Sequence, residues 1–136
     1  MSMLDLSKHI LSVGKEKGVT NLQMQKVMYF AIKDYLNKNG LDKFINEVYD
    51  EPFETWQYGP VVPELYYRYS KNGSMAINDK GVYSEDYSSM DASIKKHLNE
   101  NVFKLVEKSH EESFWQEHQG EAQQRQEYSL KDIMGD

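Results

Sequence analysis

The strongest constraint on the fold is a predicted helix, from about Thr20 to Gly40, that is apolar around much of its circumference. Thr20 and Gln23 have the spacing of a helix-starting capping box. A helix with apolar side chains on so many sides is covered by neighbours on more than one face, so we predict that it is central. Its two apolar stripes consist of Met24, Val27, Met28, Ala31 and Tyr35, and of Leu22, Tyr29, Ile32 and Leu36.

Shorter helices are predicted on both sides of this segment, from apolar spacing and from glycine and capping signals. A helix near residues 4–17 is stopped by Gly18, and a short helix within residues 41–49 is an open alternative. Pro63 begins a helix that runs to Tyr69 or Ser70. One later helix is predicted at residues 90–108. A short helix should begin at the capping box of Ser109 and Glu112, and a last helical turn at Ser129 and Asp132.

Two short segments predict a small β element. Residues 53–58 are rich in aromatic side chains and predict an extended segment, which Gly59-Pro60 then turns. Residues 75–83 contain Asn-Asp-Lys-Gly at 78–81, which predicts a small hairpin. The expected fold is therefore mainly α, with about six helices and a small β element near residues 53–58 and 75–83. We expect one domain over residues 1–136, with a polar, Gln-rich segment at about 116–127.

Composition and charge exclude several classes of function. The chain of 136 residues contains no Cys, which excludes disulfides, thiolate catalysis and cysteine-based zinc sites. Its net charge of −6 disfavours nucleic acid, and thus a DNA-binding regulator, and favours a basic partner surface. Neither a secretory signal nor a membrane span is recognisable, so we expect the protein to be cytoplasmic.

No catalytic, cofactor-binding or metal-binding motif stands out. His110, Glu111 and His118 lack the spacing of a His-Glu-x-x-His zinc site. We predict no metal, no cofactor and no enzymatic activity. A catalytic site assembled from scattered residues is the alternative that the sequence leaves open.

Aromatic side chains supply the predicted partner-binding surface, because Trp and Tyr are favoured interface anchors. Trp56 and Tyr58 lie in the densest aromatic cluster, with packing on the central helix as the alternative for Trp56. Consecutive Tyr66 and Tyr67 point about 100° apart on a helix, so Tyr67 faces outward if Tyr66 faces the core. Glu54 belongs to an acidic stretch beside the cluster, which either pairs with a basic partner or is a solvated face.

Three segments resemble a known family, the Panacea antitoxin domain. The first is Leu22 to Ala31, and the second and most specific is Asp50 to Tyr66, which contains Trp56-Gln57-Tyr58-Gly59-Pro60-Val61. The third, Ser109 to Trp115, is similar to a family segment but has Ser113-Phe114 where the family carries Asp-Pro. The three segments occur in the family's order.

The resemblance implies a mainly helical fold and a protein-binding role. Members of this family are associated with the neutralisation of unrelated toxins, and many lie on phages. The function that it implies is direct binding of a protein toxin. An adaptor that delivers its partner to a protease and a phage protein with another target are the alternatives.

Overall fold

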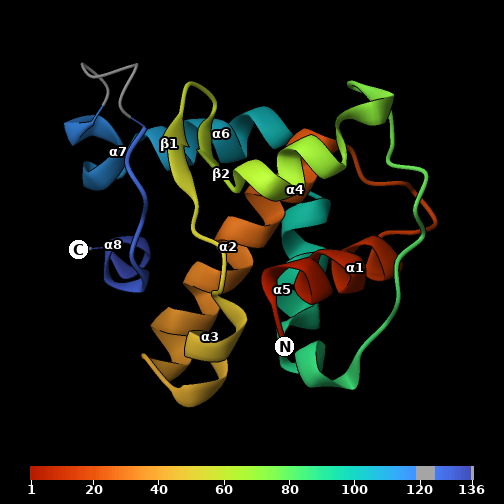
Figure 1. Ribbon diagram of the computed structural model, residues 1–136, viewed down its shortest axis with the longest axis horizontal. Helices are drawn as coiled ribbons and strands as arrows, with labels where there is room; N and C mark the ends of the chain where they lie inside the picture. The colour runs from red at the N-terminus through yellow and green to blue at the C-terminus, as the bar shows by residue number, and fades with distance from the viewer. Residues whose placement is uncertain (119–124, 136) are drawn as a thin grey trace.

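The computed structural model describes residues 1–118 and 125–135, which form a mainly helical fold with one small antiparallel hairpin (Figure 1). The α-helices are α1 (Met3–Val13), α2 (Asn21–Asn39), α3 (Lys43–Val48), α4 (Pro63–Arg68), α5 (Asp91–Leu98), α6 (Val102–His110), α7 (Ser113–Glu117) and α8 (Leu130–Met134). The strands are β1 (Glu54–Trp56) and β2 (Gly59–Val61), and 3-10 turns cover Ser70–Asn72 and Glu85–Met90. The predicted mainly α class is confirmed.

Helix α2 is the central element, as its apolar circumference predicts. It contacts α1, α5, α6, α8 and β2, and Figure 1 shows it running through the middle of the molecule. The predicted capping box is present, because Gln23 N donates to Thr20 Oγ1 and Thr20 N donates to Gln23 Oε1. Gly40 caps the other end. The predicted stripes enter the core or pack against it except at Leu22, which lines a surface pocket instead. The core also takes in Leu6 of α1 and Ile133 of α8.

The turn of the hairpin lies two residues earlier along the chain than the predicted turn at Gly59-Pro60. Gln57 and Tyr58 make the two-residue connection, while Gly59 and Pro60 already belong to β2. Trp56 pairs with Gly59 in this register. The φ of Gly59 is +97°, and a Cβ built there lies 2.4 Å from Ser109 Oγ, so both conformation and space require glycine.

The predicted hairpin at residues 75–83 is wrong. Within this described segment the residue in β pairing is Ala76, through an isolated bridge with Thr20. The backbone amides instead bond to other elements: Ile77 N donates to Val19 O and Val82 N donates to Lys8 O. The segment therefore lies over α1 and the loop that follows it, and local turn chemistry did not decide its pairing.

The predicted single helix at 90–108 is also wrong, because α5 ends at Leu98 and α6 begins at Val102. Asn101 is the N-cap of α6, and its side chain accepts a hydrogen bond from Phe103 N. The capping box expected at Ser109 is absent, since Ser109 lies buried within α6 and its hydroxyl donates to Val106 O. The described residues contain eight α-helices, against about six predicted, and this split accounts for one of the two additional helices.

The remaining predictions concern the ends of the chain. Helix α1 ends at Val13 rather than near Lys17. The last turn after Ser129 is confirmed as α8, with its capping box to Asp132. Part of the predicted polar segment, residues 119–124, lies outside the described residues. Among the described residues, no helix has the length and apolar character that crossing a membrane requires.

Candidate protein-binding groove

Aromatic side chains gather around a groove between the hairpin, α4, α6 and the start of α2. The groove has a volume of about 610 Å³, and its lining includes Trp56, Tyr58, Tyr66 and Phe103. Tyr58 is 57% exposed and Phe103 is 62% exposed, values that are large for apolar side chains without a partner. We call this depression, with the rings at its edge, the aromatic groove.

Three rings from β1 and α4 contact one another at one side of the aromatic groove. The Trp56 ring centroid lies 5.2 Å from that of Tyr66 and 6.2 Å from that of Tyr67. Tyr67 is 62% exposed and stands at the edge of the groove, outside its lining. Tyr66 is half-buried and lines the groove, so it does not face the core. A short helix resting on the hairpin gives both rings access to solvent.

Side chains of α2 fix the strand beneath these rings. Lys26 is fully buried and its Nζ donates to the carbonyl of Pro60 at 2.6 Å. Burial lowers the pKa of Lys26 to about 7. Gln25 Oε1 accepts from Val62 N at 2.9 Å, and Asn21 Nδ2 donates to Tyr66 O at 2.9 Å. The central helix thus positions both β2 and α4 by polar contacts.

A second pair of side chains fixes the loop of the hairpin from α6 and α7. Trp115 Nε1 donates to Trp56 O at 2.9 Å, and His110 Nε2 donates to Gln57 O at 3.0 Å. The two rings stack with centroids 3.7 Å apart. Burial lowers the pKa of His110, and the hydrogen bond to Gln57 O acts in the opposite direction. The partner of His110 Nε2 is thus 53 residues away along the chain.

The predicted site residues fall in one region of the molecule. Trp56 and Tyr58 line the aromatic groove, and Tyr67 stands at its edge. Glu54 lies next to them, but its carboxylate accepts a hydrogen bond from Trp56 Nε1 at 3.0 Å and does not line the groove. The lining residues that the sequence reasoning missed include Tyr66, Phe103 and Arg125. A predicted break between α5 and α6 is the signal that would have identified Phe103 as a candidate for this surface.

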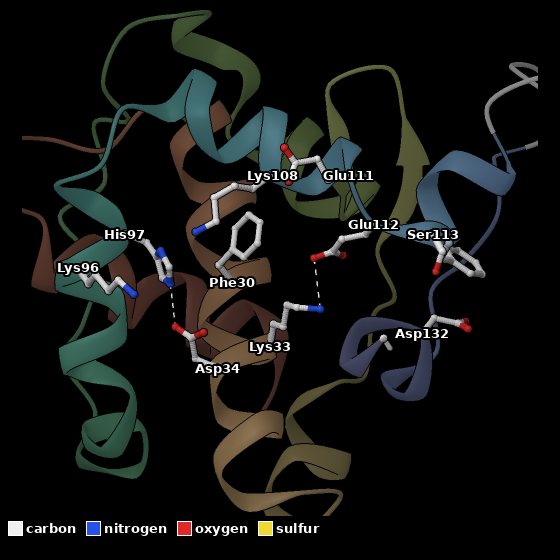
Figure 2. A pocket seen from close by; sticks show the side chains of 12 residues that line it. Phe30, Lys33, Asp34, Lys96, His97, Lys108, Glu111, Glu112, Ser113 and Asp132 are labelled. Atoms are coloured by element: carbon white, nitrogen blue, oxygen red, sulfur yellow. Dashed lines mark hydrogen bonds and ion pairs between the residues drawn. The ribbon is translucent and has the colours of Figure 1, made fainter.

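A second pocket, of about 380 Å³, is lined mainly by charged side chains of α2, α5, α6 and the segment before α7 (Figure 2). Four of these side chains pair with one another: Lys33 lies 3.2 Å from Glu112, and His97 lies 2.8 Å from Asp34. Lys33 Nζ also donates to the carbonyl of Ile133 at 2.8 Å, which fastens α8 to α2. We interpret this pocket as an internal charge network that stabilises the C-terminal helix.

The described residues contain no group of three or more His, Cys, Asp or Glu side chains arranged to hold a metal ion. His97 illustrates why acidic neighbours alone do not make such a site. Its two ring nitrogens face carboxylates: Nε2 lies 2.8 Å from Asp34 and so joins α5 to α2, and Nδ1 lies 2.5 Å from Glu100, just after α5.

Comparison with known proteins gives one distant relative. The chain is similar to Antitoxin SocA of Caulobacter vibrioides (strain NA1000 / CB15N), with 26% identity over 90 residues. The match covers 66% of this chain and 45% of the relative, so the chain spans less than half of that protein's length. No protein-family model matches the chain, the Panacea domain included, and no solved structure matches it.

Proposed function

We propose that this protein acts as an antitoxin-like binding protein, which neutralises a protein toxin by direct contact through the aromatic groove. The observation that carries the proposal is the exposure of Tyr58, Tyr67 and Phe103 around a groove of about 610 Å³. Exposed aromatic rings next to a groove are typical of interface anchors. The similarity to a protein named as an antitoxin supports the same role.

The structure beneath the groove suits binding without a large rearrangement. The hairpin is held by Lys26, Gln25, His110 and Trp115, so its rings are positioned before a partner arrives. Preorganised surfaces lose less conformational entropy on association. We place the protein in the cytoplasm, with residues 1–136 acting as one domain without a cofactor.

The test is affinity for the purified toxic product of the neighbouring gene. Phe103→Ala and Tyr67→Ala should each weaken binding by more than about 1 kcal/mol, because each removes an exposed ring. Each should change the free energy of unfolding by no more than about 0.5 kcal/mol. Val82, 64% exposed and outside the groove lining, supplies the matched control, and Val82→Ala should bind as the natural protein does.

Two outcomes contradict the proposal. Wild-type affinity in both aromatic variants removes the aromatic groove from the interface. Protection from the toxin that disappears in cells lacking one protease, with no stable complex in vitro, favours the adaptor alternative.

A further inference from the structure

The charge of the aromatic groove differs in sign from the charge of the whole chain. The chain carries a net charge of −6, yet Arg125 is the one charged side chain among the described residues that line the groove. The lining also includes Thr20 and Leu22, at the amino end of α2, where the helix dipole is positive. The groove is thus an apolar surface with a positive charge at its edge.

Arg125 is held in place by the hairpin. Its guanidinium carbon lies 3.8 Å from the centroid of the Trp56 ring. The residues after it pair with β1 and with the residue before that strand, because Thr55 N donates to Gln126 O at 3.0 Å and Tyr128 N donates to Phe53 O at 2.8 Å. The side chain therefore starts from a fixed backbone and rests on a fixed ring.

The guanidinium has no acidic partner among the described side chains, since none of their ion pairs includes Arg125. The guanidinium carbon lies over the Trp56 ring, and the N–H donors of the group lie in the guanidinium plane. That geometry is suited to a carboxylate approaching along the plane, as in bidentate arginine–carboxylate pairs.

We propose that the aromatic groove binds a segment of the partner protein in which a carboxylate lies next to aliphatic or aromatic side chains. The apolar side chains enter the groove between Trp56 and Phe103, and the carboxylate pairs with Arg125. This inference rests on the proposed function and specifies the chemistry of the partner. It replaces the basic partner surface that the net charge predicts, because local charge at the contact decides complementarity.

The experiment is selection of short random peptides displayed on phage against the immobilised wild-type protein and against Arg125→Glu. Wild type should enrich peptides that combine Asp or Glu with Leu, Phe or Trp. Arg125→Glu should lose the acidic preference and gain Lys or Arg, while keeping the apolar preference. Lys131→Glu, which reverses an exposed charge on α8 away from the groove lining, should select the same peptides as wild type.

A labelled peptide with the enriched sequence then gives the magnitude by fluorescence anisotropy. Replacing its Asp or Glu by Asn or Gln should weaken binding to wild type about fivefold, which corresponds to an exposed ion pair. The same replacement should leave binding to Arg125→Glu unchanged or improved.

Each contrary result overturns the inference. Enrichment of basic peptides by wild type, an acidic preference that survives Arg125→Glu, or no enrichment of any peptide excludes an acidic, apolar partner segment. The toxin-affinity measurement with Phe103→Ala and Tyr67→Ala is independent of these selections. A toxin that requires those rings but not Arg125 leaves the proposed function standing and refutes the charge assignment alone.

Discussion

Replacing Lys26 by Met should stabilise this protein at neutral pH. The two side chains have similar length, but Met carries no charge into a site where Lys26 is fully buried. Among the described residues no carboxylate forms an ion pair with Lys26, and its Nζ bonds to Pro60 O. The lysine therefore loses hydration without gaining a counter-charge, which lowers its pKa from 10.5 to about 7.

The size of the effect follows from proton linkage. A pKa of about 7 in the folded state, against 10.5 unfolded, costs about 4 kcal/mol of stability at pH 7. Met removes that cost but leaves the buried Pro60 carbonyl without its donor, which costs about 1–3 kcal/mol. We expect Lys26→Met to be more stable at pH 7 by about 1–3 kcal/mol.

The pH dependence gives the sharper test. Between about pH 7 and 10.5 the unfolded state binds more protons than the folded state, so the stability of wild type rises with pH across this window. Below pH 7 Lys26 is protonated in both the folded and the unfolded state, so its full destabilising effect on the folded state remains and no longer changes with pH. The advantage of Lys26→Met should therefore fall by about 3–4 kcal/mol between pH 7 and pH 10, and reverse in sign.

Urea unfolding of both proteins at pH 7 and pH 10 measures this difference directly. Burial raises the pKa of Tyr29 and Tyr128, but these groups are common to both proteins and cancel in the comparison. Lys38→Met, at an exposed lysine of the same helix, is the matched control and should show a difference that does not change with pH. A Lys26→Met protein that is less stable at pH 7, or whose advantage is constant to pH 10, refutes the reasoning.

Three further substitutions test the support of the fold. Gly59→Ala should cost more than about 2 kcal/mol in urea unfolding, because φ is positive and the new Cβ meets Ser109 Oγ; an unchanged midpoint contradicts this. Met28→Asp should cost about 3–5 kcal/mol, since the side chain is fully buried, and a melting curve equal to wild type would show that α2 is not central. Lys33→Met should speed amide hydrogen exchange in α8, because Lys33 donates to the Ile133 carbonyl of that helix. Unchanged exchange in α8 would show that this hydrogen bond does not fasten the helix to α2.

The fold was predictable from the sequence where helix-capping residues and the apolar pattern of a single helix supply the signal. The capping box of Thr20 and the apolar circumference of the helix after it gave the position and central role of α2. Pro63 likewise marked the start of α4. These signals act within a few residues, and the tertiary structure agrees with them.

The predictions that were wrong concern segments whose backbone bonds lead to distant residues. The turn signal at Asn78 to Gly81 is real chemistry, yet Ile77 N and Val82 N bond to Val19 O and Lys8 O. Asn101 is polar in a helical pattern and serves as a cap, which apolar spacing alone does not show. Sequence periodicity reports which face is apolar, and it does not report which partner that face meets.

The candidate site was predictable only where its residues lie close together in the sequence. Aromatic composition pointed to Trp56, Tyr58 and Tyr67, which lie together as expected, although their interface role stays a prediction. Arg125 and Phe103 reach the groove from segments far along the chain, so no local pattern marks them. Their contribution became visible only with the tertiary structure.

The support of the groove and the core of the fold share the same helix. Lys26 and Gln25 lie within the buried length of α2, yet their polar atoms bond to the backbone of β2 and of Val62 after it. A change at either residue therefore alters stability and the position of the rings above the strand together. Loss of partner binding counts as evidence for a contact only when stability is unchanged, as expected for Tyr67→Ala. By the same reasoning, Gly59→Ala should weaken binding in proportion to its effect on the hairpin, without touching the partner.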